Sequence, residues 1–212
     1  MPGFTIAILL LGLLGAYLLG SIPTGFLLAK ALKGIDIREH GSRNTGATNV
    51  FRTVGKGAGV TVLIIDLLKG VLAVVLMRWL VAAIPGLDLS LDGRSWVYVL
   101  AALLAIVGHS KSVWIGFTGG KSAATGLGVL LALNWHVALG VAAMFGVVLM
   151  VSRTVSVGSI AASISAMVLM VVLQQPLAFI LLAIAGGTHV LLRHRSNISR
   201  LLAGTEPKTF GQ

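Results

Sequence analysis

Three polar segments carry the residue types that bind anions, and the first of them is residues 41–52. It contains Ser42, Asn44, Asn49 and Arg52 and has no carboxylate. Its glycines let backbone N–H groups approach an anion, and its arginines offer forked donors to phosphate oxygens. The segment therefore suits phosphate, although an ordinary solvated basic loop has the same composition.

The second segment ends in Gly119, Gly120 and Lys121, directly before an uncharged apolar run. It is not a nucleotide P-loop, because Ile115 stands where that pattern needs its first glycine. A helix N-terminus beside a lysine can bind an anion. A simple turn whose lysine reaches toward the head groups explains the same residues, and the pattern leaves both interpretations open.

The third segment, residues 193–200, follows the last apolar run. His194 and Asn197 are spaced i, i+3, which predicts that they share one helix face. A basic cluster that stops membrane transfer is the simpler interpretation. Ser156, near the end of another apolar run, is expected to line a site formed by these segments.

The elements that position these segments are predicted to be membrane helices. The chain is 57% hydrophobic and 10% charged, with a mean hydropathy of +1.00. Soluble domains carry about 25% charged residues, so lipid is the solvent that suits this sequence. Seven helices are expected, in the runs 1–29, 60–80, 95–108, 123–133, 136–151 and the two halves of 157–192 on either side of residues 174–176.

The distribution of basic residues predicts the orientation. With the N-terminus outside, the inner segments are 30–59, 109–121, 153–156 and 193–212, and they hold 13 of the 16 Lys and Arg residues. Cytoplasmic loops carry this excess of positive charge. The prediction is an all-α, polytopic membrane protein, a single domain over residues 1–212, with a cytoplasmic C-terminus.

Several function classes are excluded or disfavoured. There is no cysteine, so disulfides and thiolate nucleophiles are absent. With 6% aromatic residues and basic residues confined to short loops, the net charge of +10 favours membrane lipids or small anions as partners over nucleic acid. No metal motif, His-x4-Asp pair or catalytic carboxylate pair occurs, so we expect no metal and no cofactor. Asp66 and Lys69, inside one run, are expected to pair, and further roles for them stay open.

Four stretches together resemble the bacterial acyl-phosphate:glycerol-3-phosphate acyltransferases, in the order of that family and over nearly the whole chain. Ser-x-Asn-x-Gly-Ala-Thr-Asn-Val is the most specific part. The stretches are Gly20-Ser21-Ile22-Pro23 with Gly25, Gly41-Ser42-x-Asn44-x-Gly46-Ala47-Thr48-Asn49-Val50-x-Arg52, Gly108-His109 with Phe117 and Gly119-Gly120-Lys121, and Arg193-His194-Arg195-x-Asn197-Ile198-x-Arg200-Leu201.

The resemblance implies transfer of a fatty acyl group from acyl phosphate to the 1-hydroxyl of glycerol 3-phosphate, which releases phosphate and gives 1-acylglycerol 3-phosphate (lysophosphatidic acid), in the first membrane step of phospholipid synthesis. It implies a bacterial plasma (inner) membrane and an active site on the cytoplasmic face. It leaves open a contact with the enzyme that forms acyl phosphate. The donor phosphate would accept the hydroxyl proton, so no protein general base is expected.

By the same resemblance, the catalytic residues, with electrostatic and positioning roles, are Ser42, Arg52, Lys121 and His194. The residues implied to bind substrate are Asn44, Asn49, Gly119, Gly120, Ser156 and Asn197. Glu206 would have a structural role. The sequence departs from the family pattern at Arg43, Ser112, Thr118 and Ser122, which bears on the shape of the second segment.

Two other functions use the same basic loops. An anion transporter would need a polar pathway through the midplane of the membrane, whereas the polar groups here cluster at one face. A non-enzymatic scaffold for lipid-synthesis proteins would need no substrate turnover. Acyl-chain preference, kinetic order and oligomeric state do not follow from the sequence.

Overall fold

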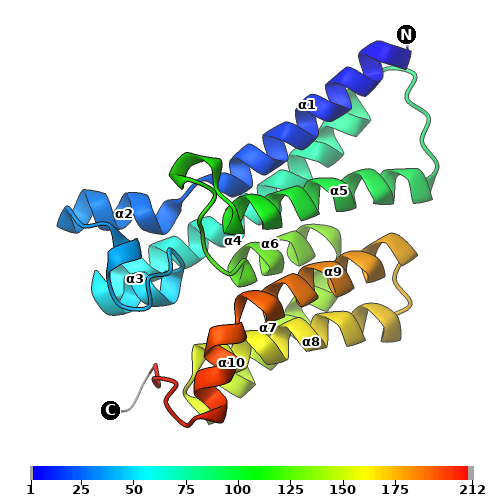
Figure 1. Ribbon diagram of the computed structural model, residues 1–212. Helices are drawn as coiled ribbons and strands as arrows, with labels where there is room; N and C mark the ends of the chain where they lie inside the picture. Colours follow the sequence, from blue (N-terminus) through cyan, green and yellow to red (C-terminus); the bar gives the residue numbers. More distant parts are fainter. Residues whose placement is uncertain (1, 210–212) are drawn as a thin grey trace.

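The computed structural model describes residues 2–209, and helices form nearly all of the regular structure in that part (Figure 1). The predicted all-α class is confirmed. The elements are α1 (Pro2–Ser21), α2 (Thr24–Lys33), η1 (Ile37–Glu39), α3 (Ala47–Thr53), α4 (Lys56–Ala83), α5 (Leu91–Ser110), η2 (Val113–Ile115), α6 (Ala123–Leu133), α7 (Trp135–Ser152), α8 (Val155–Val172), α9 (Leu177–Arg193) and α10 (Arg195–Leu202).

Long apolar helices make the chain an integral membrane protein. In the described residues, five helices are long and apolar enough to cross a bilayer, and α9 with α10 makes a sixth if that bent pair counts as one span. Helix α6 has 11 residues. At ~1.5 Å per residue it covers roughly half of a ~30 Å hydrocarbon core. The predicted number of seven crossing helices therefore stays a prediction.

The turns between apolar runs lie where the sequence indicated. Helix α6 occupies the predicted residues 123–133, and the side chain of Asn134 then accepts the backbone N–H groups of His136 and Val137 at 3.0 and 3.1 Å. This cap begins α7 within a single residue. Pro176 likewise precedes α9 after the break at residues 173–176. Helices α4 and α5 extend several residues beyond the predicted runs.

Two predictions about the first third of the chain were wrong in detail. The uncharged run 1–29 is not one helix, because it breaks at Ile22 and Pro23 and continues as α2. Proline has no backbone N–H with which to continue the helix, and at the break the Ile22 carbonyl accepts Lys69 Nζ at 2.9 Å and the Thr24 N–H at 3.0 Å. Residues 30–59, expected as a loop, contain η1 and α3.

Glycines allow the close approach of the helices that frame the centre of the molecule. A Cβ on Gly128 of α6 would lie 2.0 Å from the Leu67 carbonyl oxygen, and one on Gly70 of α4 would lie 2.2 Å from that of Thr125. Helices α1 and α5 meet in the same way at Gly20 and Gly108. Membrane helices commonly pack through small residues, which bring their backbones together.

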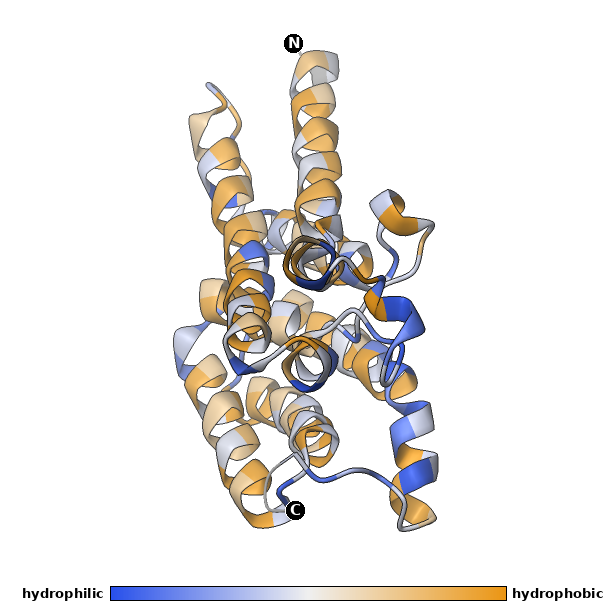
Figure 2. Cartoon of the chain, turned by 90° about the vertical axis from the view of Figure 1, so that its left-hand side faces the viewer, coloured by the Kyte–Doolittle hydropathy of each residue, from blue (hydrophilic) through white to orange (hydrophobic). Residues whose placement is uncertain are grey.

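The helices form two groups, α1–α4–α5 and α7–α8–α9, with α6 between them (Figure 1). The predicted inner segments lie toward one end, on the left of Figure 1, and the N-terminus and the 84–90 loop lie at the other. We call the first the polar end: α2, α3, residues 111–122, α10 and the tail 203–209. Figure 2, which looks at this end, shows hydrophilic loops and short helices among mostly hydrophobic long helices.

Candidate functional site

A cavity of about 630 Å³ opens at the polar end and runs between α6, α7, α8 and α9. Its polar part brings together side chains from all three segments that the sequence singled out, together with His109 and Glu206. The predicted residues that line it are Ser42, Asn44, Asn49, Arg52, Lys121, Ser156, His194 and Asn197.

Asn49 holds the first loop together. Its Nδ2 donates to the carbonyls of Asn44, His40 and Ile37 at 2.9, 3.0 and 3.3 Å, and its Oδ1 accepts the Ser42 backbone N–H at 2.9 Å. Gly41 has a φ of +57°, and a Cβ there would lie 2.3 Å from Asn49 Oδ1. The loop therefore wraps around a buried amide, which places Ser42 at the cavity.

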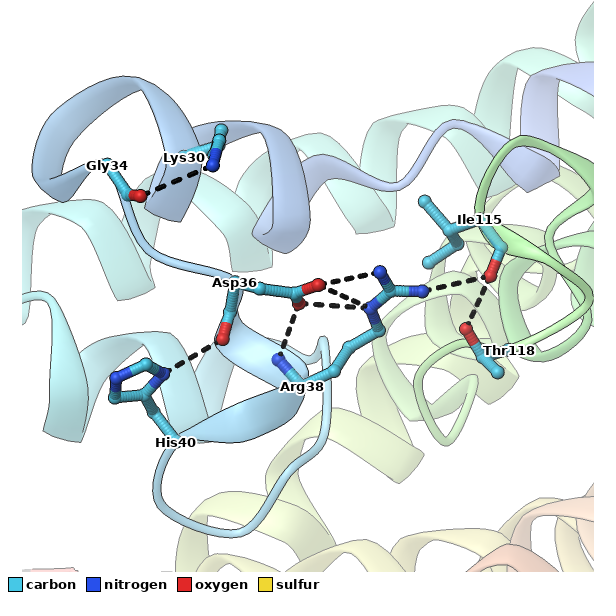
Figure 3. Close-up of polar contacts among 7 residues, drawn as sticks. All are labelled: Lys30, Gly34, Asp36, Arg38, His40, Ile115 and Thr118. Atoms are coloured by element: carbon cyan, nitrogen blue, oxygen red, sulfur yellow. Dashed lines mark hydrogen bonds and ion pairs between the residues drawn. The ribbon is translucent and has the colours of Figure 1, made fainter.

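Arg38 connects the first loop to the second (Figure 3). Its guanidinium binds the Asp36 carboxylate at 2.6 Å and donates to the Ile115 carbonyl at 3.2 Å, while lying 5.0 Å from the Phe26 ring centroid. The hydrogen bond from Arg38 lowers the pKa of Asp36 to about 2. The pair thus stays ionised and ties together segments 77 residues apart in sequence.

The glycines of the second loop do not line the cavity. The Gly120 N–H donates to the His109 carbonyl at 3.1 Å, and a Cβ on Gly120 would lie 2.1 Å from His109 Nε2. The carbonyls of Gly119 and Gly120 accept bonds from Arg193 at 3.0 and 3.1 Å. Both glycines therefore permit close packing over His109, and the Gly120 N–H is not available to an anion.

The N-terminus of α6 lies beside Lys121, as the sequence suggested. Ser122 adopts a left-handed φ of +63° and donates its hydroxyl to the Ile106 carbonyl at 2.8 Å. Ala123 and Ala124, at the start of the helix, line the cavity. The first N–H groups of a helix lack partners within that helix, so this end of the cavity favours negative charge.

Glu206 organises the third segment. It accepts hydrogen bonds from Asn197, Arg200 and Ser156 at 2.6, 2.7 and 2.8 Å, and Asn197 in turn accepts a bond from Lys121. Burial opposes the negative charge of Glu206, but these donors outweigh it and hold the pKa of the carboxyl below its ordinary value. One carboxylate therefore fixes α8, α10 and, through Asn197, Lys121.

His194 and Asn197 both line the cavity, but they do not share one helix as predicted. Helix α9 ends at Arg193, α10 begins at Arg195, and their axes differ by 57°. The imidazole Nδ1 of His194 lies 2.8 Å from the Val190 carbonyl oxygen. The bend at His194 is what turns α10, and with it Asn197, toward the cavity.

Arg52 contacts the C-terminal tail. Its guanidinium donates to the carbonyls of Pro207 and Lys208 at 3.2 and 3.4 Å and to Thr209 Oγ1 at 3.4 Å. Thr209 also binds the backbone of Arg153 and Val155 at the start of α8. The tail thereby crosses from α3 to α8 at the mouth of the cavity.

Asp66, Lys69 and His109 form a buried cluster of ionisable side chains between α4 and α5. Lys69 Nζ lies 2.8 Å from Asp66 Oδ1, which confirms the predicted pair, and His109 Nδ1 lies 3.6 Å from the same oxygen. All three side chains are less than a tenth exposed. Lys69 also holds the carbonyl at the α1–α2 break, so the cluster supports the packing beneath the second loop.

We expect Asp66→Asn to destabilise the protein by about 3–5 kcal/mol, because it leaves the Lys69 ammonium buried without its counter-charge. Thermal unfolding in detergent measures the effect. The double variant Asp66→Leu/Lys69→Met removes both charges and should regain most of the lost stability. An unchanged unfolding temperature for Asp66→Asn would contradict the structural role of the pair.

Glu206→Gln tests the network at the polar end. A neutral amide lacks the negative charge of the carboxylate and has one acceptor oxygen for the three donors. We therefore expect a loss of about 1–3 kcal/mol in stability and weaker positioning of Lys121. Unfolding temperature and the affinity for inorganic phosphate report the two effects. Lys208 lies two residues after Glu206 and is exposed. The control variant Lys208→Ala should therefore change neither the stability nor the positioning of Lys121.

Sequence reasoning missed Asp66, His109 and Arg200 as cavity residues and gave Glu206 only a structural role. One signal was present: Glu206 is the single acidic residue after Asp92. Within residues 2–209, no three His, Asp or Glu side chains lie close enough together to hold a metal ion.

Taken together, these features define a helical integral membrane protein in which an apolar cavity ends in a cation-rich pocket. A family model described as glycerol-3-phosphate acyltransferase matches residues 10–204. The chain belongs to this family.

Related sequences and solved structures match this chain over nearly its full length. A protein named glycerol-3-phosphate acyltransferase from Trichormus variabilis is 57% identical over 199 residues, which cover 91% of this chain and 88% of that protein. One with the same name from Nostoc sp. is 54% identical over 97% and 94% of the two chains. Crystal structures of PlsY (YgiH), an integral membrane glycerol 3-phosphate acyltransferase, superpose with TM-scores of 0.85 for the glycerol 3-phosphate form and 0.82 for the lysophosphatidic acid form. The glycerol 3-phosphate form is 41% identical to this chain, and the match covers 96% of both chains. The lysophosphatidic acid form is 40% identical, and the match covers 96% of this chain and 95% of the PlsY chain.

Proposed function

We propose that this protein transfers a fatty acyl group from acyl phosphate to the 1-hydroxyl of glycerol 3-phosphate and releases lysophosphatidic acid and phosphate. The observation that carries this proposal is the shape of the cavity, whose cationic end suits phosphate groups and whose apolar part suits a fatty chain. Membership of the family and the ligands named for the PlsY structures support the same reaction.

Phosphate binding is assigned to the charged residues of the polar end. Lys121, Arg52 and Arg200 line the cavity there, with Ser42 and Asn44 as additional hydrogen-bonding side chains. Arginine forks and a helix N-terminus both bind phosphate oxygens well. Asn49, Asn197 and Ser156 are already engaged within the protein, so we assign them to holding this site in shape. Gly119 and Gly120 are assigned the same role.

The reaction needs positioning and charge stabilisation more than a protein nucleophile. The 1-hydroxyl oxygen attacks the acyl carbonyl carbon, the carbon–oxygen bond to phosphate breaks, and the hydroxyl proton passes to the departing phosphate. Because acyl phosphate is already activated, a fixed set of donors at the developing negative charge can supply most of the acceleration. We assign that role to Lys121 and Arg52, with Ser42 and His194 positioning the substrates.

Topology and location follow the charge distribution. We propose that the polar end faces the cytoplasm of a bacterial cell, across its plasma membrane, with the N-terminus outside and the C-terminus inside. The enzyme that produces acyl phosphate would then have access to the cavity from the same side.

Reconstituted protein tests the reaction directly. Purified protein in lipid vesicles, given acyl phosphate and labelled glycerol 3-phosphate, should form labelled lysophosphatidic acid and release an equal amount of phosphate. Acyl-CoA supplied in parallel should not replace acyl phosphate. Absence of product with every acyl donor would overturn the proposal, and product from acyl-CoA alone would overturn the choice of donor.

The charge of Lys121 gives a pH dependence. Burial lowers the pKa of Lys121 to about 8, with Glu206 opposing the shift and the nearby arginines adding to it. A lysine is charged below its pKa, so its attraction for phosphate is present below pH ~8 and is lost above. We expect the KM for glycerol 3-phosphate to rise roughly tenfold between pH ~7.5 and ~9. In Lys121→Arg, which stays charged, that rise should disappear, and an equal rise in both proteins would contradict the assignment.

A further inference from the structure

Beyond its polar end, the cavity continues as an apolar arm. Mostly small or aliphatic side chains from four helices line it, together with Phe145 of α7 and with Ser159 and Ser163 of α8. The small or aliphatic lining residues include Leu130 of α6, Val141 of α7, Ala166 of α8, and Leu182 and Ala183 of α9.

Helix geometry gives the depth of this arm. On α8 the lining runs from Ser156 to Ala166, and on α9 it runs from Leu182 to Val190, close to the end of the helix at Arg193. At ~1.5 Å per residue these stretches place the deepest lining residues roughly 15 Å from the polar end. A saturated chain advances roughly 1.3 Å per carbon when extended, so about twelve carbons fit along this depth.

The deep end of the arm is closed. Leu130, Val141, Ala166 and Ala183 line it and are each at most 7% exposed. They belong to one core cluster with Val137, Ala138 and Met170, which are fully buried and lie outside the lining. Met170 follows Ala166 by one turn of α8, so its side chain lies in the layer behind the cavity floor.

The region near the polar end is more open. A Cβ on Gly126 would meet no atom within 4 Å, and Leu63 of α4 is 46% exposed although it lines the same cavity. A lipid tail can therefore enter beside α4 and α6.

We propose that this floor, formed by Leu130, Val141, Ala166 and Ala183 and backed by Met170, sets the acyl-chain length that the enzyme uses best. This inference rests on the proposed function, because the chain in question belongs to its acyl donor. The tail enters from lipid, which is as apolar as the arm, so each methylene that fits in the arm changes kcat/KM little. Carbons beyond the floor gain nothing and must fold back or leave the arm.

A series of saturated acyl phosphates, from octanoyl to stearoyl, tests the proposal in reconstituted protein. In the wild type, kcat/KM should stay nearly level and then fall at a break point, when the acyl phosphate is expressed as its concentration in the membrane. Ala166→Leu raises the floor and should move the break point shorter by roughly three carbons, with octanoyl phosphate used as before. Met170→Ala opens space behind the floor and should move it longer by roughly two.

A matched control uses the opposite face of α8. Ile164 is 48% exposed and does not line the cavity, so Ile164→Leu should leave the chain-length profile unchanged. Unfolding temperature and octanoyl turnover show whether each variant is folded.

The outcomes separate the two proposals. Break points that move in opposite directions in Ala166→Leu and Met170→Ala support the floor. Active variants whose break points stay at the wild-type length overturn it and leave the acyl transfer intact. Loss of all product in the wild type, with every donor, overturns the proposed function itself. If Ala166→Leu does not fold, an unchanged break point in folded Met170→Ala still overturns the floor.

Discussion

Lys121→Ala should lower kcat/KM for glycerol 3-phosphate by at least ~10²-fold, comparable with the loss of one donor that stabilises an oxyanion. Lys121 lies beside the N-terminus of α6 in a half-buried position, where its charge is poorly screened by water. Its ammonium is held by Asn197, which Glu206 fixes in turn. Initial rates of lysophosphatidic acid formation over a range of both substrates measure the loss.

Lys111→Ala is the matched control for this result. Lys111 belongs to the same segment, is exposed and does not line the cavity. Removing it takes away the same formal charge from the polar end without touching the site, so it should change kcat/KM by less than about threefold. Equal losses in the two variants would mean that general attraction of anions, and no specific contact, explains the effect.

Arg52→Ala should cost a similar ~10²-fold in kcat/KM, and Arg52→Lys should recover only part of it. The guanidinium lines the cavity and also binds the tail carbonyls of Pro207 and Lys208. A lysine keeps the charge but cannot offer two parallel donors to a phosphate group. Kinetics of the three proteins, with unfolding temperatures to exclude a general loss of structure, give the comparison.

Arg43 provides the control in the same loop. It is exposed, lies outside the cavity lining and has a φ of +57°, which glycine adopts without strain. Arg43→Gly should therefore retain activity and lose no stability. Full activity of Arg52→Ala, or a complete rescue by Arg52→Lys, would contradict the proposed contact with phosphate.

Hydropathy and local turn signals were sufficient to predict most of the membrane helices. Asn134 and the residues before α9 ended and began helices where the sequence suggested, because capping and proline effects act over a few residues. The break at Pro23 was missed because residues 1–29 are uncharged and membrane helices tolerate proline, although Ser21, Pro23 and Thr24 interrupt the apolar run. Lys69, which binds the Ile22 carbonyl at this break, lies 47 residues further along the chain.

The residue types in the sequence predicted which side chains line the cavity better than they predicted what each of those residues contacts. Ser42, Arg52, Lys121 and His194 all line the cavity, as the motifs suggested. Gly119 and Gly120, by contrast, fit against His109 and Arg193, and Asn49 holds its own loop.

The bonds from Arg193 to Gly119 and Gly120 join residues 74 and 73 positions apart, so spacing along the chain does not reveal them. The same holds for Glu206, whose partner Ser156 is 50 residues away, and for the contact between Arg52 and the tail. A single carboxylate in a basic tail gives no local pattern, since its role arises only when α8 and α10 pack together.

The central claim is that cationic segments from distant parts of the chain face the cytoplasm together. The chain has no cysteine, so single cysteines at exposed Arg43, Lys111 and Arg195 can be labelled without background. A membrane-impermeant maleimide applied to sealed vesicles of known orientation should modify all three from the cytoplasmic side and none from the other. Modification of any one of them only from the outer side would contradict the account.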